Sequence, residues 1–98
     1  MATILAAVTI RGGGVVPAES TAGATLTLDN NDGILRFPNP QNHEFVAVIS
    51  HFQNYPYTTS THWIKNRGVD FIVVGHTAMD TSGRTFPIGD FNTIVVAL

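Results

Sequence analysis

Short runs in which apolar and polar residues alternate recur along the chain, and this period of two constrains the fold more than any other feature. The alternation is clearest over residues 3–11 and 24–29. Successive side chains of a strand point to opposite faces, so alternation predicts strands with one buried face. No stretch carries the 3.6-residue repeat of a convincing amphipathic helix. The sequence therefore predicts an all-β protein.

Turn signals separate these runs. Residues 29–33 read Asp-Asn-Asn-Asp-Gly and residues 80–83 read Asp-Thr-Ser-Gly. Asn, Asp and Gly tolerate positive φ, so they predict tight turns between antiparallel strands. We expect strands at about 3–11, 24–29, 34–37, 44–52, 61–65, 69–77, from near 85, and 91–98. Seven to eight short strands at this spacing predict an antiparallel β-sandwich or jelly roll, or else a small barrel.

The size and composition of the chain exclude several classes of protein. Its 98 residues fit a single domain, 1–98. The chain has no cysteine, which excludes disulfides and thiolate metal sites, and its formal charge of −2 excludes a strongly basic nucleic-acid binder. No apolar segment approaches the ~18 residues of a membrane-spanning helix, and the first residues lack the basic region of a signal peptide. We expect a soluble protein with neither a nucleic-acid nor a membrane partner.

A deficit of charge is the strongest functional signal. Charged residues make up 12% of the chain, against roughly 25% in a typical soluble domain. Because the cores of protein interfaces are depleted in charge, part of this surface is expected to contact another protein. The alternative is a threonine-rich β protein with a neutral surface.

Two segments locate the expected contacts. Residues 44–52 are apolar on both faces, which predicts a central strand covered on both sides. Gly12 to Gly14 follow the first strand and predict either a hinge or a mobile docking arm over residues 1–16. The expected protein-interface residues are Ile4, Leu5, Val8, Ile10, Val46 and Val48.

An aromatic segment offers a second kind of contact. Residues 52–63 place aromatic rings around a loop rich in Asn, Thr and Ser, a combination that suits a sugar or a protein surface. Trp63 equally fits a core position. The expected ligand or partner contacts are Tyr55, Tyr57, Trp63 and His76.

No constellation of catalytic residues is legible. Asp80 and Asp90 lie in glycine-rich turns, where aspartate usually caps the backbone. The histidines lack the close spacing of common zinc motifs. We therefore expect no enzyme activity, no metal and no cofactor. The histidines are His43, His51, His62 and His76.

Part of the chain resembles a known sandwich family. Residues 45–49 (Phe-Val-Ala-Val-Ile), 68–74 (Gly-Val-Asp-Phe-Ile-Val-Val) and 93–97 (Thr-Ile-Val-Val-Ala) resemble strands of the H-type lectins. The resemblance implies an oligomeric sandwich that binds sugars. Many of those proteins carry an aromatic residue after the Gly-x-x-Phe strand, where this chain has His76 and Thr77.

The whole chain is also similar to small bacteriophage virion proteins of the capsid decoration or cement type. It shares their Ala/Gly/Thr-rich start, their low charge, their lack of cysteine and a predicted strand that runs to the last residue. The resemblance implies dimers or trimers on the outer capsid surface, bound to a major capsid protein after synthesis in the host cytoplasm. We expect a structural protein that decorates and stabilises a phage capsid. The alternative is a carbohydrate-binding module on a phage tail or cell surface.

Overall fold

The computed structural model describes residues 3–11, 13–29, 32–50, 59–79 and 90–98. In chain order the elements are β1 (Thr3–Arg11), β2 (Gly14–Val15), the 3₁₀ turn η1 (Pro17–Glu19), β3 (Thr25–Asp29), β4 (Asp32–Arg36), β5 (Phe45–Ser50), β6 (Thr59–Arg67), β7 (Phe71–Met79) and β8 (Phe91–Ala97). The strand predicted to begin near residue 85 falls outside the described residues.

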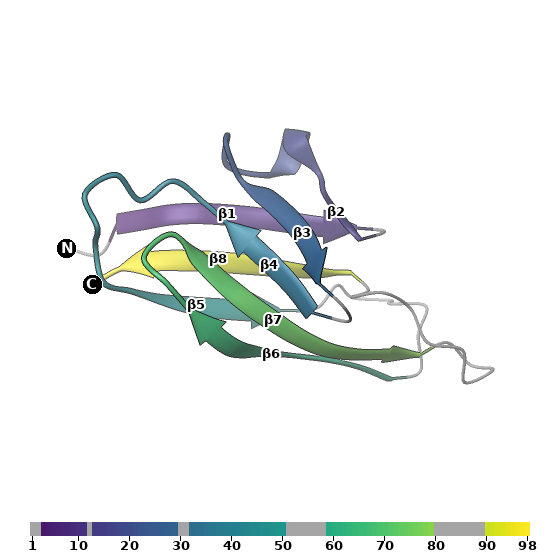
Figure 1. Ribbon diagram of the computed structural model, residues 1–98. Coiled ribbons are helices and arrows are strands. Elements are labelled where there is room, and N and C mark those ends of the chain that lie inside the picture. The colour runs from purple at the N-terminus through teal and green to yellow at the C-terminus, as the bar shows by residue number, and fades with distance from the viewer. Residues whose placement is uncertain (1–2, 12, 30–31, 51–58, 80–89) are drawn as a thin grey trace.

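The strands form two antiparallel sheets of four. Sheet A has the order β2-β1-β8-β5 and sheet B the order β3-β4-β7-β6. Figure 1 shows β1, β8 and β5 running side by side, with the strands of sheet B crossing them obliquely in front. The prediction of an antiparallel β-sandwich of about eight strands is confirmed.

The core lies between the two sheets and follows the predicted alternation. On β8 every second residue from Phe91 is buried, while Asn92, Ile94 and Val96 lie on the other face. Since a half-buried strand must keep one face apolar, this alternation fixes which face of β8 meets sheet B. The core consists of Ala6, Val8, Ile10, Leu35, Phe37, Phe45, Ile72, Val74, Phe91 and Val95.

The first strand belongs to the body of the sandwich. β1 lies between β2 and β8 and pairs with β8 from Thr3 to Ile10. Its buried side chains face sheet B, so residues 3–11 do not form a separate docking arm in this structure. Gly13 has a φ of +80°, and residues 13–15 turn back so that β2 pairs with the end of β1.

The edge of β1 beyond β2 is covered by the segment that follows η1. Thr21 donates its backbone N–H to Ala7 O at 2.9 Å and accepts the Ala7 N–H on Oγ1 at 2.9 Å. Ser20 Oγ accepts the Thr9 N–H at 3.0 Å. These side chains satisfy backbone groups that an edge strand would otherwise expose to another chain.

A buried asparagine joins two loops at one end of the sandwich. The Asn39 amide donates to His43 O at 2.9 Å and to Val69 O at 2.7 Å, and its oxygen accepts the His43 N–H at 3.0 Å. The side chain therefore ties the β4–β5 connection to the β6–β7 turn, with its hydrogen-bonding groups satisfied.

The position of β5 differs from the prediction. The apolar character of residues 44–52 on both faces predicted a central, doubly covered strand, but β5 is the last strand of sheet A. Its inner residues pack on the core, whereas Val46 and Val48 are exposed on the outer face. An apolar outer face on an edge strand requires a functional explanation rather than a packing one.

Candidate functional site

The outer face of sheet A carries a cluster of exposed apolar side chains. Directly opposite residues on neighbouring strands share a face. In one row Val96 lies between Ile4 and Val46, and in the next Ile94 lies between Ala7 and Val48. We call these six residues the outer apolar face: Ile4, Ala7, Val46, Val48, Ile94 and Val96.

Four of the six side chains of the outer apolar face are exposed, and those of Ala7 and Val96 are half-buried. Ile4 is 63% exposed and Val48 is 58% exposed, and Val46 and Ile94 are also exposed. From the ~4.8 Å strand spacing and ~3.3 Å rise per residue, the face covers roughly 200 Å² in plan. Contiguous apolar surface of this kind marks sites of interaction more often than isolated exposed residues do.

A bulge explains why Ile4 belongs to this face. The register between β1 and β8 shifts between Ile4 and Ala6, so Leu5 is the extra residue. A one-residue shift moves the following side chains to the opposite face. The alternation alone had placed Ile4 on the same face as Ala6; in the structure Ile4 points outward, and Leu5 packs against the core.

The predicted interface residues are therefore divided between the surface and the interior. Ile4, Val46 and Val48 lie on the outer apolar face. Val8 and Ile10 do not lie on the surface, contrary to the prediction that they belong to the interface. They follow the bulge in phase with Ala6 and are buried between the sheets. The prediction missed Ile94 and Val96, although their alternation with buried Phe91, Thr93 and Val95 was the signal that could have located them.

The six residues of the outer apolar face are uncharged, and the exposed Glu44, in phase with Val46 just before β5, lies at its border. Neither β5 nor β8 contains a charged residue, and the one charged residue of β1 is Arg11 at its end. Beyond the two apolar rows lies a polar row of Thr9, Asn92 and Ser50, in which Thr9 Oγ1 donates to Asn92 Oδ1 at 3.1 Å. An apolar centre with a polar border is the usual arrangement of a protein interface.

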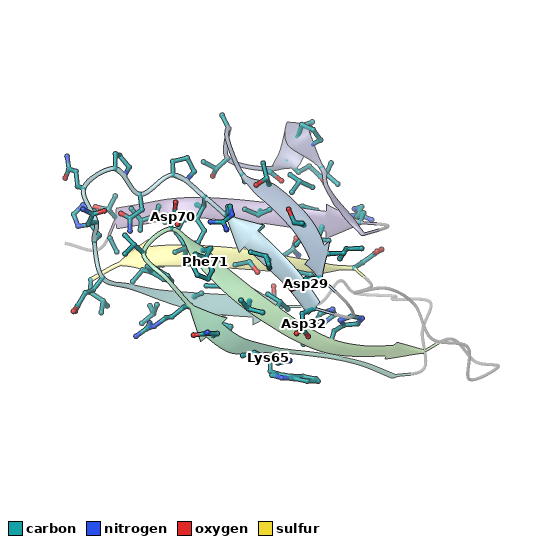
Figure 2. The ribbon with its side chains drawn as sticks, in the orientation of Figure 1. Asp29, Asp32, Lys65, Asp70 and Phe71 are labelled. Carbon is teal, nitrogen blue, oxygen red and sulfur yellow. The ribbon has the colours of Figure 1, made fainter. Side chains whose placement is uncertain are left out.

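The outer face of sheet B has the opposite character. Lys65 Nζ lies 2.8 Å from Asp32 Oδ2, and Arg36 Nη1 lies 3.8 Å from Asp70 Oδ1. Figure 2 shows Lys65 of β6 and Asp32 of β4 reaching toward one another across β7. These exposed pairs contribute little stability, but they keep this face hydrated.

Gly75 makes room on this face. A Cβ at Gly75 would lie 2.7 Å from the Trp63 ring and 2.8 Å from Lys65 Cδ. The indole of Trp63 therefore covers the glycine, and Lys65 passes beside it to reach Asp32. Trp63 is 45% exposed, so it is a surface residue and not part of the core.

The candidate ligand contacts do not converge on one site. Trp63 lies opposite Gly75 on the outer side of sheet B, and His76, the next residue of β7, points to the inner side. There the His76 ring stacks on His62 at 6.0 Å, and His62 lies 4.6 Å from the Phe91 ring. Tyr55 and Tyr57 lie outside the described residues.

Within the described ranges, no three His, Asp or Glu side chains come close enough together to bind a metal ion. No helix in the described part of the chain is long and apolar enough to cross a membrane. Scans against protein-family models, curated proteins and solved structures found no match for this chain. What the geometry defines is a β-sandwich with one charged face and one uncharged, apolar face.

Proposed function

We propose that this chain is a structural protein, not an enzyme, that works by lasting protein–protein contact through the outer apolar face. The observation that carries the proposal is the uncharged cluster in which Ile94 lies between Ala7 and Val48, with the row of Ile4, Val96 and Val46 beside it. The specific form we propose is a protein that decorates and stabilises a phage capsid on its outer surface. Its partners would be a major capsid protein and other copies of itself.

Burial energetics support lasting contact. Full burial of a Val or Ile side chain stabilises by roughly 1.5–3 kcal/mol. The exposed side chains of the face are already about half covered, so about half of this free energy remains to be gained. Each would therefore contribute about 1 kcal/mol on full burial. The absence of charge means that no ion has to be desolvated there, which would otherwise oppose association.

The site-level test is to compare outward-facing lysine substitutions on the two sheets. Ile4→Lys and Ile94→Lys place a charge within the outer apolar face, and Thr27→Lys is the matched control on β3 of sheet B, where Thr27 is exposed. Circular dichroism should show that all three variants fold, because none replaces a core residue. Ile4→Lys and Ile94→Lys should lose binding to particles in co-sedimentation, while Thr27→Lys should retain it.

The particle-level test is quantitative mass spectrometry of virus particles purified from the source of the sequence. A copy number comparable to that of the major capsid protein would support decoration of the shell. Only a few copies per particle would indicate a tail location instead, and absence from particles would refute the virion assignment. Equal binding by all the lysine variants would refute the assignment of the interface to sheet A.

Carbohydrate binding is the second candidate, and exposed Trp63 favours it. Its ring lies over Gly75 on an otherwise open face, beside the Lys65–Asp32 pair. Aromatic rings of this kind can stack on sugars, with nearby polar groups supplying hydrogen bonds. Trp63→Ala should abolish binding on a glycan array without unfolding the chain. A wild-type protein that binds no glycan would exclude this function.

A further inference from the structure

In the described part of the chain the sandwich has four strand edges, and three of them are protected against pairing with another strand. On the β1 side, β2 and the Ser20–Thr21 segment bond to the strand. β6 has a bulge between Ile64 and Asn66 and carries the charges of Lys65 and Arg67. β3 is only five residues long, ends in Asp29 and lies in contact with β2. Charge, bulges and short length are the usual means by which proteins prevent edge pairing.

β5 is the exception. Its sequence, Phe-Val-Ala-Val-Ile-Ser, has no charge, no proline and no glycine, and its register with β8 is regular along its length. Within the described part of the chain, no strand pairs with its second edge. A six-residue uncharged strand of β-branched and aromatic residues is the sequence type that pairs with further strands.

The hydrogen bonds of β5 show which groups its open edge presents. Leu98 donates its N–H to Glu44 O at 2.9 Å, so residue 44 bonds toward the β8 side. In an antiparallel pair this direction alternates, so Phe45, Ala47 and Ile49 direct their N–H and C=O groups to the open edge. The Arg67 side chain supports this assignment. Its Nη1 donates to Phe45 O at 2.8 Å, so this carbonyl points away from β8.

We propose that this open edge pairs with the same edge of a second copy of the chain. The two β5 strands run antiparallel about a two-fold axis at Val48, so each sheet A continues into the other. A second copy fits because β5 has no charged residue, so neither strand would bury a charge against the other. Closed two-fold pairing also leaves no edge for further growth.

The position of the axis follows from Arg67 and from a hollow beside the edge. A pairing centred on Ala47 would bring Ile49 of the second copy to Phe45, where the Arg67 side chain already lies against the edge. Centring on Val48 leaves the bond from Arg67 to Phe45 O intact and places Ile49 of each copy opposite Ala47 of the other. Ala47 borders a hollow of about 290 Å³ between β5 and β6, which Ile64, Ile72 and Arg67 also line. The larger side chain thus lies next to the space that the smaller one leaves.

The proposed pairing also extends the outer apolar face. Val46 and Val48 lie on the strand that would join the two copies, so the two faces become one continuous surface of roughly 400 Å² in plan. Burial at the paired edge itself is small compared with the ~800 Å² per partner of a standard interface. We therefore expect a weak dimer in free solution that is reinforced when both faces bind one larger partner.

The test uses the absence of cysteine in the chain. In the proposed register Val48 faces Val48 of the second copy as a non-hydrogen-bonded pair, about 4.5 Å apart at Cα, within disulfide range. Val48→Cys should therefore form a disulfide-linked dimer when the purified chain is oxidised with diamide. Val46→Cys is the matched control on the same face of the same strand. It lies opposite Ser50 of the second copy, and should give at least about tenfold less dimer.

A second variant separates edge pairing from stacking of the two outer faces. Ala47→Pro removes an N–H that points to the open edge, and costs no bond to β8. Val48→Cys combined with Ala47→Pro should stay monomeric under the same oxidation. The proposal would be overturned if Val48→Cys alone stayed monomeric, if Val46→Cys linked equally well, or if the double variant linked as well as Val48→Cys.

These outcomes are independent of the capsid proposal. Ile4 lies two strands away from the open edge, roughly 10 Å, so Ile4→Lys should leave the cysteine linkage of Val48→Cys unchanged while removing binding to particles. Loss of particle binding with intact linkage tests the outer face alone. Failure of linkage in a chain that still binds particles overturns only the edge pairing.

Discussion

The buried hydroxyl of Thr93 makes a specific prediction about stability. Thr93 is 1% exposed on the inner face of β8, directly opposite Val8 on one side and Ile49 on the other. Its Oγ1 has no hydrogen-bond partner among the described residues. Thr93→Val replaces this hydroxyl with a methyl group of nearly the same shape, so it removes the unsatisfied group without changing the packing.

The expected gain can be worked from the cost of burying the hydroxyl. An unsatisfied buried polar group costs about 1–3 kcal/mol. Thr93→Val should therefore raise the free energy of unfolding by about 1–2 kcal/mol, the lower part of that range. In a domain of this size, 1 kcal/mol corresponds to a rise of roughly 4–8 °C in Tm.

The assay is urea unfolding of the wild type and three variants, followed by circular dichroism. Thr93→Ser keeps the hydroxyl but loses a methyl group, so it should be less stable than wild type by about 1 kcal/mol. Thr93→Ala removes both the hydroxyl and the methyl group and leaves a small void. Its free energy of unfolding should therefore be lower than that of Thr93→Val by more than the contribution of a single methyl group. A Thr93→Val protein no more stable than wild type, with an unchanged m-value, would refute the reasoning, because the hydroxyl would then have to be satisfied in solution.

Three further substitutions test contacts on the loops and on sheet B. Asn39→Ala should destabilise the fold by about 2–3 kcal/mol in the same urea assay, because it leaves carbonyl groups in both connected loops without their donor. Gly75→Ala should displace Trp63, the only tryptophan, and so shift the fluorescence emission of the folded protein; an unchanged spectrum would contradict the stacking. Lys65→Met should change stability by less than about 1 kcal/mol, since its ion pair with Asp32 is exposed; a larger loss would show a buried role for the pair.

The strands were predictable because their signals are local. The alternation over residues 3–11 and the Asp-Asn-Asn-Asp-Gly turn each describe one strand or one hairpin, and β1 and the β3–β4 hairpin follow them closely. Alternation with a period of two arises whenever one face of a strand is buried. It therefore does not depend on which strands lie next to one another in the sheet. The fold class could therefore be predicted from the sequence without knowing the strand order.

The strand order and the bulge could not be predicted in the same way. β5 reads as a central strand because Val46 and Val48 are apolar, yet its place at the edge depends on which strands pair, which is a long-range property. The extra residue at Leu5 is equally hidden, because residues 3–8 contain too little polarity to mark a change of face. Both errors concern the outer face of sheet A, where the usual rule of a polar exterior fails.

That failure and the low charge of the chain have a common explanation. Most charges of the described strands lie on sheet B and its turns, at Asp29, Asp32, Arg36, Lys65, Arg67 and Asp70. On the strands of sheet A the one charged residue is Arg11 at the end of β1, and β5 and β8 have none. A uniformly neutral surface would spread its few charges evenly over both sheets. The segregation instead leaves one uncharged face, and beside it an edge that Arg67 contacts at Phe45 O alone among its backbone groups, on the same side of the molecule. A protein that must stay dispersed would be expected to place at least one charge on β5. Its absence is best explained if β5 is covered whenever the protein is at work, which is why we place both proposed contacts there.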